Sequence, residues 1–109
     1  MDAVSDIVAQ DHETMTRIAA GNRAALADLY QQHNQALLTY LRHFTTDHGL
    51  VEDILQDTFL AAWRGAGRFA GRSPVRGWLF GIARRRAIDA LRRRESHLLT
   101  SLVTALTRR

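Results

Sequence analysis

The stretch VEDILQDTFLAAWR at residues 51–64 spaces its apolar side chains three and four positions apart, which is the period of an α-helix. A second stretch, SPVRGWLFGIARRRAIDALRRR at residues 73–94, repeats this spacing after a glycine-rich break. They predict helices from about Leu50 to Arg64 and from Pro74 to about Arg94, the second with Ser73 as its N-cap. The expected inward residues are Val51, Ile54, Leu55, Thr58, Phe59 and Ala62 in the first helix, and Val75, Trp78, Leu79, Ile82, Ala83, Ala87, Ala90 and Leu91 in the second.

Two further helices are predicted upstream of these stretches. One runs from about Asp6 to Ala20 and stops at Gly21, and the other, capped by Asn22, runs from about Arg23 to Phe44. Their expected inward residues are Ile7, Met15, Ile18 and Ala19, and then Leu26, Leu29, Tyr30, His33, Leu37, Tyr40, Leu41 and Phe44. Because 109 residues provide for a single core, we expect an all-α fold, a compact bundle of about four helices.

Composition narrows the class of protein. The chain has no cysteine, which excludes disulfides, thiolate metal sites and cysteine nucleophiles. No stretch approaches the roughly 18 apolar residues of a membrane span, and residues 1–10 are acidic where a signal peptide is basic. We therefore expect a cytosolic protein with no membrane insertion.

Charge divides the chain into two halves. Residues 1–57 contain nine acidic side chains and three arginines, a net charge of −6. Residues 58–109 contain twelve arginines but only Asp89 and Glu95 as acids, a net charge of +10. The two halves therefore predict partners of opposite charge.

Acidic side chains gather on the outward face of the helix at 51–64, where Asp53 and Asp57 lie one turn apart beside Glu52 and Gln56. Like charges at this spacing repel by about 0.2–0.5 kcal/mol, and an external basic partner would relieve the repulsion. A merely solvated face, helped by acids near a helix N-terminus, is the plainer interpretation and stays open.

Ten arginines lie between Arg64 and Arg94, interleaved with Phe69, Trp78 and Phe80, and this pattern predicts binding of a polyanion. The spacing of Trp78 favours a core position over base stacking. The loop GAGRFAGRS at residues 65–73 has no Walker or dinucleotide spacing. Its glycines either line a small pocket for a phosphate or a flipped base, or merely connect two helices.

No set of residues predicts catalysis or a metal site. The histidines follow no metal-binding spacing, and the serines lack a nucleophile context; they are His12, His33, His43, His48 and His97, and Ser5, Ser73, Ser96 and Ser101. No nucleophile, base and orienting residue are recognisable together. We expect no enzyme activity, no metal and no cofactor.

The two quoted stretches, VEDILQDTFLAAWR and then RFAGRSPVRGWLFGIARRRAIDALRRR, resemble region 2 of an extracytoplasmic-function (ECF) sigma factor, a small sigma-70-type subunit of bacterial RNA polymerase. The resemblance covers about residues 11–95. It implies a promoter-recognition domain that binds core RNA polymerase and helps to melt the minus-ten promoter element.

The resemblance also implies the contact residues. The clamp helices of the polymerase β′ subunit would be bound by Glu52, Asp53, Gln56, Asp57 and Leu60. The non-template strand of the minus-ten element would be bound by Arg68, Phe69, Ala70, Gly71, Arg72, Ser73, Arg76, Arg84, Arg85 and Arg92, with the loop capturing a flipped base. Arg85 stands where the family commonly has an asparagine, so the base preference is expected to differ.

Domain organisation follows from the same resemblance. Residues 1–95 are expected to form region 2, and residues 96–109 to begin a linker to a second domain, region 4. The apolar residues Leu98, Leu99, Leu102, Val103 and Leu106 predict a short amphipathic helix there. An anti-sigma factor is a further expected partner. The residues alone also permit a small helical interaction or nucleic-acid-binding adaptor, which equal affinity for duplex and single strand would favour.

Overall fold

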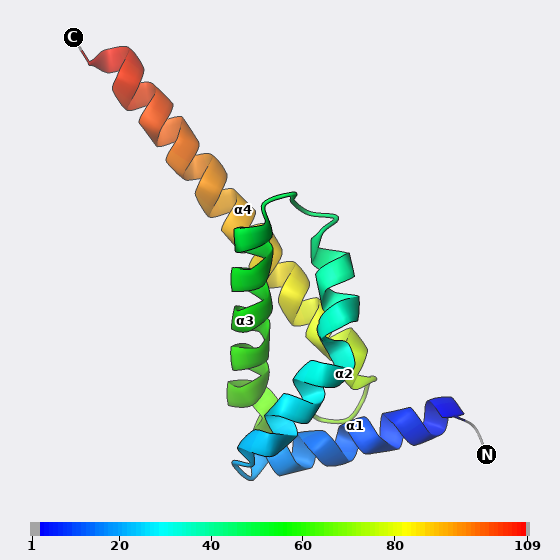
Figure 1. Ribbon diagram of the computed structural model, residues 1–109. Helices are drawn as coiled ribbons and strands as arrows, with labels where there is room; N and C mark the ends of the chain where they lie inside the picture. Colours follow the sequence, from blue (N-terminus) through cyan, green and yellow to red (C-terminus); the bar gives the residue numbers. More distant parts are fainter. Residues whose placement is uncertain (1–2, 109) are drawn as a thin grey trace.

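Four α-helices and one 3-10 turn make up the part of the chain that the structure describes, residues 3–108 of this computed structural model (Figure 1). In chain order they are α1 (Ala3–Ala19), α2 (Arg23–Leu41), α3 (His48–Gly65), the 3-10 turn η1 (Ala66–Arg68) and α4 (Val75–Thr107). No strand occurs between residues 3 and 108. The predicted all-α fold of about four helices is confirmed.

Local side chains fix where two of the helices begin. The Ala25 amide donates to the Asn22 side chain at 3.2 Å, and the Leu50 amide donates to Asp47 Oδ1 at 3.1 Å, so both residues act as N-caps. The prediction for Ser73 was wrong. Pro74 occupies the cap position of α4 without a side-chain hydrogen bond, which leaves Ser73 one residue too early to reach the first amides.

Three helices pack side by side, and the fourth crosses one end of this bundle. α2, α3 and the first half of α4 lie against one another, and α1 runs across the end where α2 begins and α3 finishes (Figure 1). α1 also contacts η1, which brings an N-terminal helix beside the loop that precedes α4. This contact matters for the candidate site, because it joins residues far apart in the sequence.

The core lies between the inner sides of α2, α3 and α4. Leu37, Leu41 and Leu79 are completely buried, and burying one such side chain contributes about 1.5–3 kcal/mol. Every residue predicted to face inward on α3 is buried. The buried row of α4 ends in small side chains, Ala83, Ala87 and Ala90, which permit close approach of its neighbours.

Three predicted core residues are instead exposed. Ile7 is 52% exposed, Tyr30 is 40% exposed, and Ala19 also faces solvent. Because α1 crosses only the end of the bundle, Met15 and Ile18 reach the core but Ile7 and Ala19 do not. α2 also stops at Leu41, before the predicted end at Phe44, and continues as a turn.

α4 is longer than expected. The sequence predicts an end near Arg94 and then a separate short helix, but one unbroken helix of 33 residues runs to Thr107. No glycine or proline occurs after Gly81 to interrupt it. Its last turns project from the bundle (Figure 1) and expose Leu98, Leu99, Leu102, Val103 and Leu106 by 55–77%. No helix among residues 3–108 is long and apolar enough to cross a membrane.

Candidate functional site

The outward side of α3 presents five side chains that we call the acidic face: Glu52, Asp53, Gln56, Asp57 and Leu60. All five are exposed, and Leu60 is 45% exposed. The spacing of Asp53, Asp57 and Leu60 puts them along one stripe of the helix. Within residues 3–108, no cation pairs with these carboxylates. The acidic face therefore retains its negative charge.

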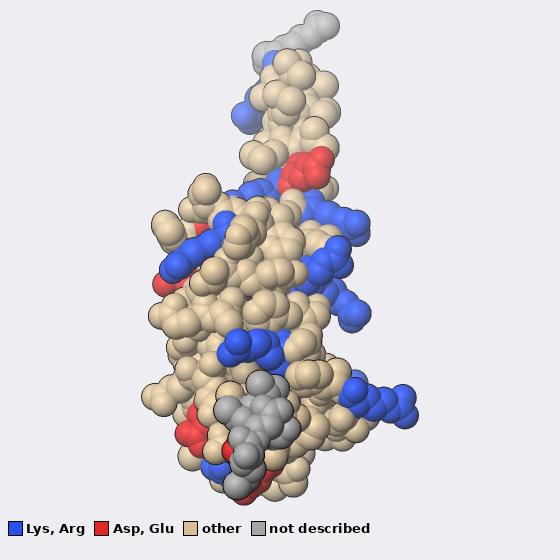
Figure 2. All heavy atoms as spheres, turned by 90° about the vertical axis from the view of Figure 1, so that its right-hand side faces the viewer, with Lys and Arg blue, Asp and Glu red and all other residues tan. Residues whose placement is uncertain are grey.

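Arginines form an exposed surface over the loop and α4. Arg68, Arg72, Arg76, Arg84, Arg85, Arg86 and Arg92 are all exposed. From Arg64 to Arg94, only Arg94 pairs with a carboxylate in the described chain, through its 2.8 Å contact with Asp47. Figure 2 shows arginines gathered along one edge of the molecule, with few acidic side chains among them. This surface is suited to bind a polyanion.

A small pocket, which we call the loop pocket, lies between α1 and the loop before α4. Its volume is about 300 Å³, and it is lined by His12, Met15, Thr16, Ala19, Ala66, Gly67, Phe69, Ala70 and Gly71. Gly71 has a φ of +71°, a left-handed conformation that favours glycine. Of the loop residues expected around this pocket, Phe69, Ala70 and Gly71 line it, whereas Arg72 and Ser73 do not.

α1 supplies the side of the loop pocket that sequence reasoning missed. The rings of His12 and Phe69 meet edge to face, with centroids 5.4 Å apart. His12 Nε2 is buried and has no hydrogen-bond partner among the described residues. Nothing in the sequence signals this contact, because His12 lies far from the loop along the chain and follows no motif.

A buried polar chain links three helices beneath the arginine surface. Arg76 Nε donates to His33 Nδ1 at 3.3 Å, and His33 Nε2 lies 3.1 Å from Asp11 Oδ2. Since Nδ1 accepts from arginine, we assign the proton to Nε2, which donates to the carboxylate. Asp11 and His33 are 5% and 2% exposed, so α1 and α2 together orient Arg76 at the start of α4.

A second hollow, which we call the arginine groove, lies between the end of α3 and α4. Its volume is about 470 Å³, and it is lined by Ala61, Gly65, Arg68, Trp78, Gly81, Ile82, Arg85 and Arg86. No acidic residue lines it. Two residues predicted to bind nucleic acid, Arg68 and Arg85, are thus brought together although seventeen positions apart in the sequence.

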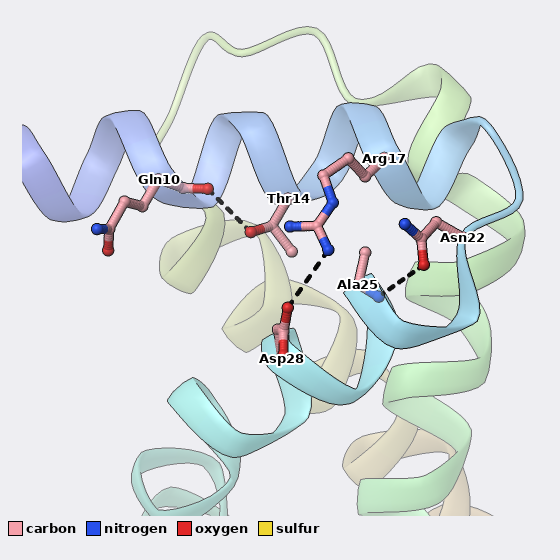
Figure 3. A network of polar contacts seen from close by, with 6 residues as sticks. All are labelled: Gln10, Thr14, Arg17, Asn22, Ala25 and Asp28. Atoms are coloured by element: carbon pink, nitrogen blue, oxygen red, sulfur yellow. Dashed lines mark hydrogen bonds and ion pairs between the residues drawn. The ribbon is translucent and has the colours of Figure 1, made fainter.

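A third hollow, between α1 and α2, differs because its one cation, Arg17, pairs with a carboxylate. Arg17 Nη2 lies 3.5 Å from Asp28 Oδ2, and Thr14 Oγ1 donates to the Gln10 carbonyl at 2.9 Å (Figure 3). Both charged side chains are substantially exposed, so the ion pair contributes about 0–1 kcal/mol. Of these contacts only the Arg17–Asp28 pair joins α1 to α2, next to the Asn22 cap that Figure 3 also shows.

Asp47 lies where the start of α3 meets α4 and accepts hydrogen bonds from both. The hydrogen bond from the Leu50 amide, followed by that from Arg94, lowers the pKa of Asp47 below its usual value. This group caps α3 and ties it to α4.

Between residues 3 and 108, no three His, Asp or Glu side chains are placed to hold a metal ion.

Comparison with known proteins identifies the family. The model of the family Sigma-70 region 2 matches residues 29–97. Two similar curated proteins are the RNA polymerase sigma factor YlaC of Bacillus subtilis (36% identical over 74% of this chain and 47% of the relative) and the ECF RNA polymerase sigma factor SigM of Mycobacterium tuberculosis (34% identical over 80% of this chain and 44% of the relative).

The comparison extends to a third relative and to solved structures. The RNA polymerase sigma factor CnrH of Cupriavidus metallidurans is 36% identical over 75% of this chain and 43% of the relative. The chain thus spans less than half the length of these relatives. No solved structure matches it. The helical fold, the family match and the relatives agree with the motifs at residues 51–64 and 68–94, and the chain belongs to the Sigma-70 region 2 family, as a region 2 domain of the ECF type.

Proposed function

We propose that this domain binds core RNA polymerase through the acidic face and holds unpaired promoter DNA through the loop pocket and the arginine surface. The observation that carries the proposal is the separation of charge on the folded domain. The carboxylates of α3 are exposed and form no ion pair among the described residues, and the same is true of the arginines of the loop and the first half of α4. Family membership supplies the two partners of opposite sign.

The acidic face is suited to a helical partner that carries basic side chains. Asp53, Gln56 and Asp57 would form the polar contacts, and the exposed Leu60 would supply an apolar one. The clamp helices of the β′ subunit are the partner we propose for it. Like charges across such a contact cost several kcal/mol, so the sign of the charge on α3 should decide binding.

The DNA-facing side would stabilise a melted strand without any covalent chemistry. Flipping one base out of the stack costs a few kcal/mol, which pocket contacts and phosphate neutralisation must offset. The loop pocket offers Phe69 and His12 to such a base, and Arg76, Arg84, Arg85 and Arg92 offer charge to the phosphates. We place the captured base on the non-template strand of the minus-ten element.

Two wider expectations belong to this proposal. Residues 1–95 would act as region 2, within the cytoplasm where polymerase works. An anti-sigma factor would compete for one of the two surfaces.

The decisive experiment is co-purification with core RNA polymerase. Asp57→Arg should abolish co-purification, while Glu13→Arg, which makes the same charge change at an exposed site on α1, should retain it. Circular dichroism should show the same helix content in both variants. Equal co-purification of Asp57→Arg and Glu13→Arg would contradict the proposed polymerase surface.

A further inference from the structure

The arginine groove carries charge that no group in the described chain balances. Arg68, Arg85 and Arg86 all line it, no carboxylate does, and none of the three forms an ion pair among residues 3–108. Guanidinium groups held close together repel one another unless an anion lies between them. Their forked donors match phosphate oxygens in particular.

Trp78 gives the groove an aromatic wall beside these cations. Its ring is half-buried: one side packs on the core, and another borders the groove. A Cβ atom at Gly65 would lie 3.6 Å from Trp78 Cζ2, so a side chain at this position would cover that edge of the ring, which glycine leaves open. An aromatic ring bordered by arginines is the combination that binds an unpaired nucleotide, and it distinguishes this groove from a site for an acidic peptide.

Two neighbouring aromatic rings, Phe69 and Trp78, separate the arginine groove from the loop pocket. Phe69 lines the loop pocket, Trp78 lines the groove, and their ring centroids are 5.2 Å apart. A DNA strand that crosses this pair of rings would have one hollow on either side. The two sites are therefore placed for nucleotides of the same strand.

We infer that the arginine groove is a second nucleotide subsite, which takes an unpaired base against Trp78 and its phosphates on Arg68, Arg85 and Arg86. This inference rests on the proposed function, since it assumes that the strand whose base enters the loop pocket continues across Phe69. It adds a site of its own, because the groove is formed by α3, η1 and α4 and shares no residue with the loop pocket.

Gly81 offers a way to close the groove without damaging the fold. It is exposed in the second turn of α4, and a Cβ atom there would meet nothing within 4 Å. A larger side chain would therefore enter the groove, and replacing glycine inside a helix favours folding. Gly77 is a matched control, because it lies one turn earlier, is equally exposed and open, and does not line the groove.

The test compares Gly81→Leu with Gly77→Leu in binding a labelled random-sequence single strand of about 12 nucleotides, and the corresponding duplex. We expect Gly81→Leu to weaken single-strand binding about tenfold, with duplex affinity and polymerase co-purification unchanged, and Gly77→Leu to resemble the parent. A second variant, Arg86→Gln, should reduce the log-log salt slope of single-strand binding by about 0.7.

Each other outcome overturns the inference. If Gly81→Leu binds like the parent, or if both leucine variants lose the same affinity, the groove holds no nucleotide. If Gly81→Leu loses duplex and single-strand affinity equally, the groove is only a general anion surface. These results leave the proposed function intact as long as the parent binds the strand, whereas a parent that binds no single strand contradicts both.

Discussion

α3 and α4 pack against each other, but their outer sides carry opposite charge. Both bury a stripe of residues at helical spacing, made of Ile54, Leu55 and Phe59 on α3 and ending in small alanines on α4. Outside this stripe, α3 presents carboxylates and α4 presents arginines. The outer carboxylates of α3 take no part in ion pairs of the described chain. Stability and binding should therefore respond to different substitutions on the same two helices.

The largest effect is expected from the inner side of α4. Leu79→Ala should lower the free energy of unfolding by about 2–5 kcal/mol, because the leucine is completely buried and its removal leaves a cavity. Urea unfolding followed by circular dichroism measures this change. Arg84→Ala, on the outer side of the same helix, should stay within about 0.5 kcal/mol of the parent. If Leu79→Ala and Arg84→Ala lower the free energy of unfolding by similar amounts, the claim that only the inner side of α4 contributes to stability is wrong.

A smaller effect on the free energy of unfolding is expected at the polar chain Asp11–His33–Arg76, which contacts the start of α4. Asp11→Ala should cost about 1–3 kcal/mol, because it leaves the buried His33 Nε2 proton without its acceptor. The same urea titration applies. Glu13→Ala, an exposed change on the same helix, provides the control and should be nearly neutral. If Asp11→Ala is equally neutral, the polar chain to Arg76 adds nothing to stability.

The outer side of α4 should affect DNA binding and leave folding alone. Replacing Arg84 and Arg85 together by alanine should reduce the log-log salt slope of single-strand binding by about 1.4, as two phosphate contacts are lost. Fluorescence anisotropy at several salt concentrations measures the slope, and polymerase co-purification should persist. The paired control is Arg23→Ala with Arg42→Ala, two exposed arginines of the acidic half. An equal fall in slope there would mean that net charge alone drives binding.

The smallest effect should arise where the start of α3 meets α4. Because its pKa is lowered in the fold, Asp47 stabilises the domain above the pKa of the unfolded chain, and this contribution is lost as pH falls through the lower folded pKa. Asp47→Asn keeps a good capping side chain but loses the charge that faces Arg94. Its Tm should be slightly below that of the parent at pH 7 and equal to it in acid.

Asp53→Asn provides the comparison for this pH dependence. Asp53 lies on the same helix and has no ion-pair partner among the described residues. Asp53→Asn removes one carboxylate charge without touching the Asp47–Arg94 contact, so a pH-dependent change in Tm that is specific to Asp47→Asn is assigned to that contact. A Tm gap for Asp47→Asn that persists in acid would show that the cap geometry, and not the charge, is responsible.

Structural features that depend on residues close together along one helix could be predicted from the sequence. The inward row of α3 followed from its period alone, and so did the exposed acidic face. Prediction failed where contacts join distant segments. Nothing in the period of α1 indicates that Asp11 meets His33 or that His12 borders the loop, because those contacts depend on how α1 crosses the bundle.

Three further errors concern α4 and the loop before it. The end of α4 was predicted near Arg94, but neither glycine nor proline follows Gly81, so no strong helix breaker interrupts the helix before Thr107. Ser73 has the chemistry of a cap without its position, since Pro74 takes the extended backbone that precedes the first helical residue. The predicted lining of the loop pocket extended too far along the loop, since Gly71 borders the pocket but Arg72 and Ser73 do not.

Because α4 is one unbroken helix, it fixes the distance between residues of its first half and residues of its last turns. Arg85, Arg92, Leu99 and Leu106 recur every seven residues, so they follow one side of the rod with a drift of only about 20° per repeat. Leu99 lies about 21 Å beyond Arg85 along the axis. A partner that contacts Leu99 and Leu106 is therefore held at a fixed distance and direction from the arginine groove, and any unwinding of α4 between them would change that alignment.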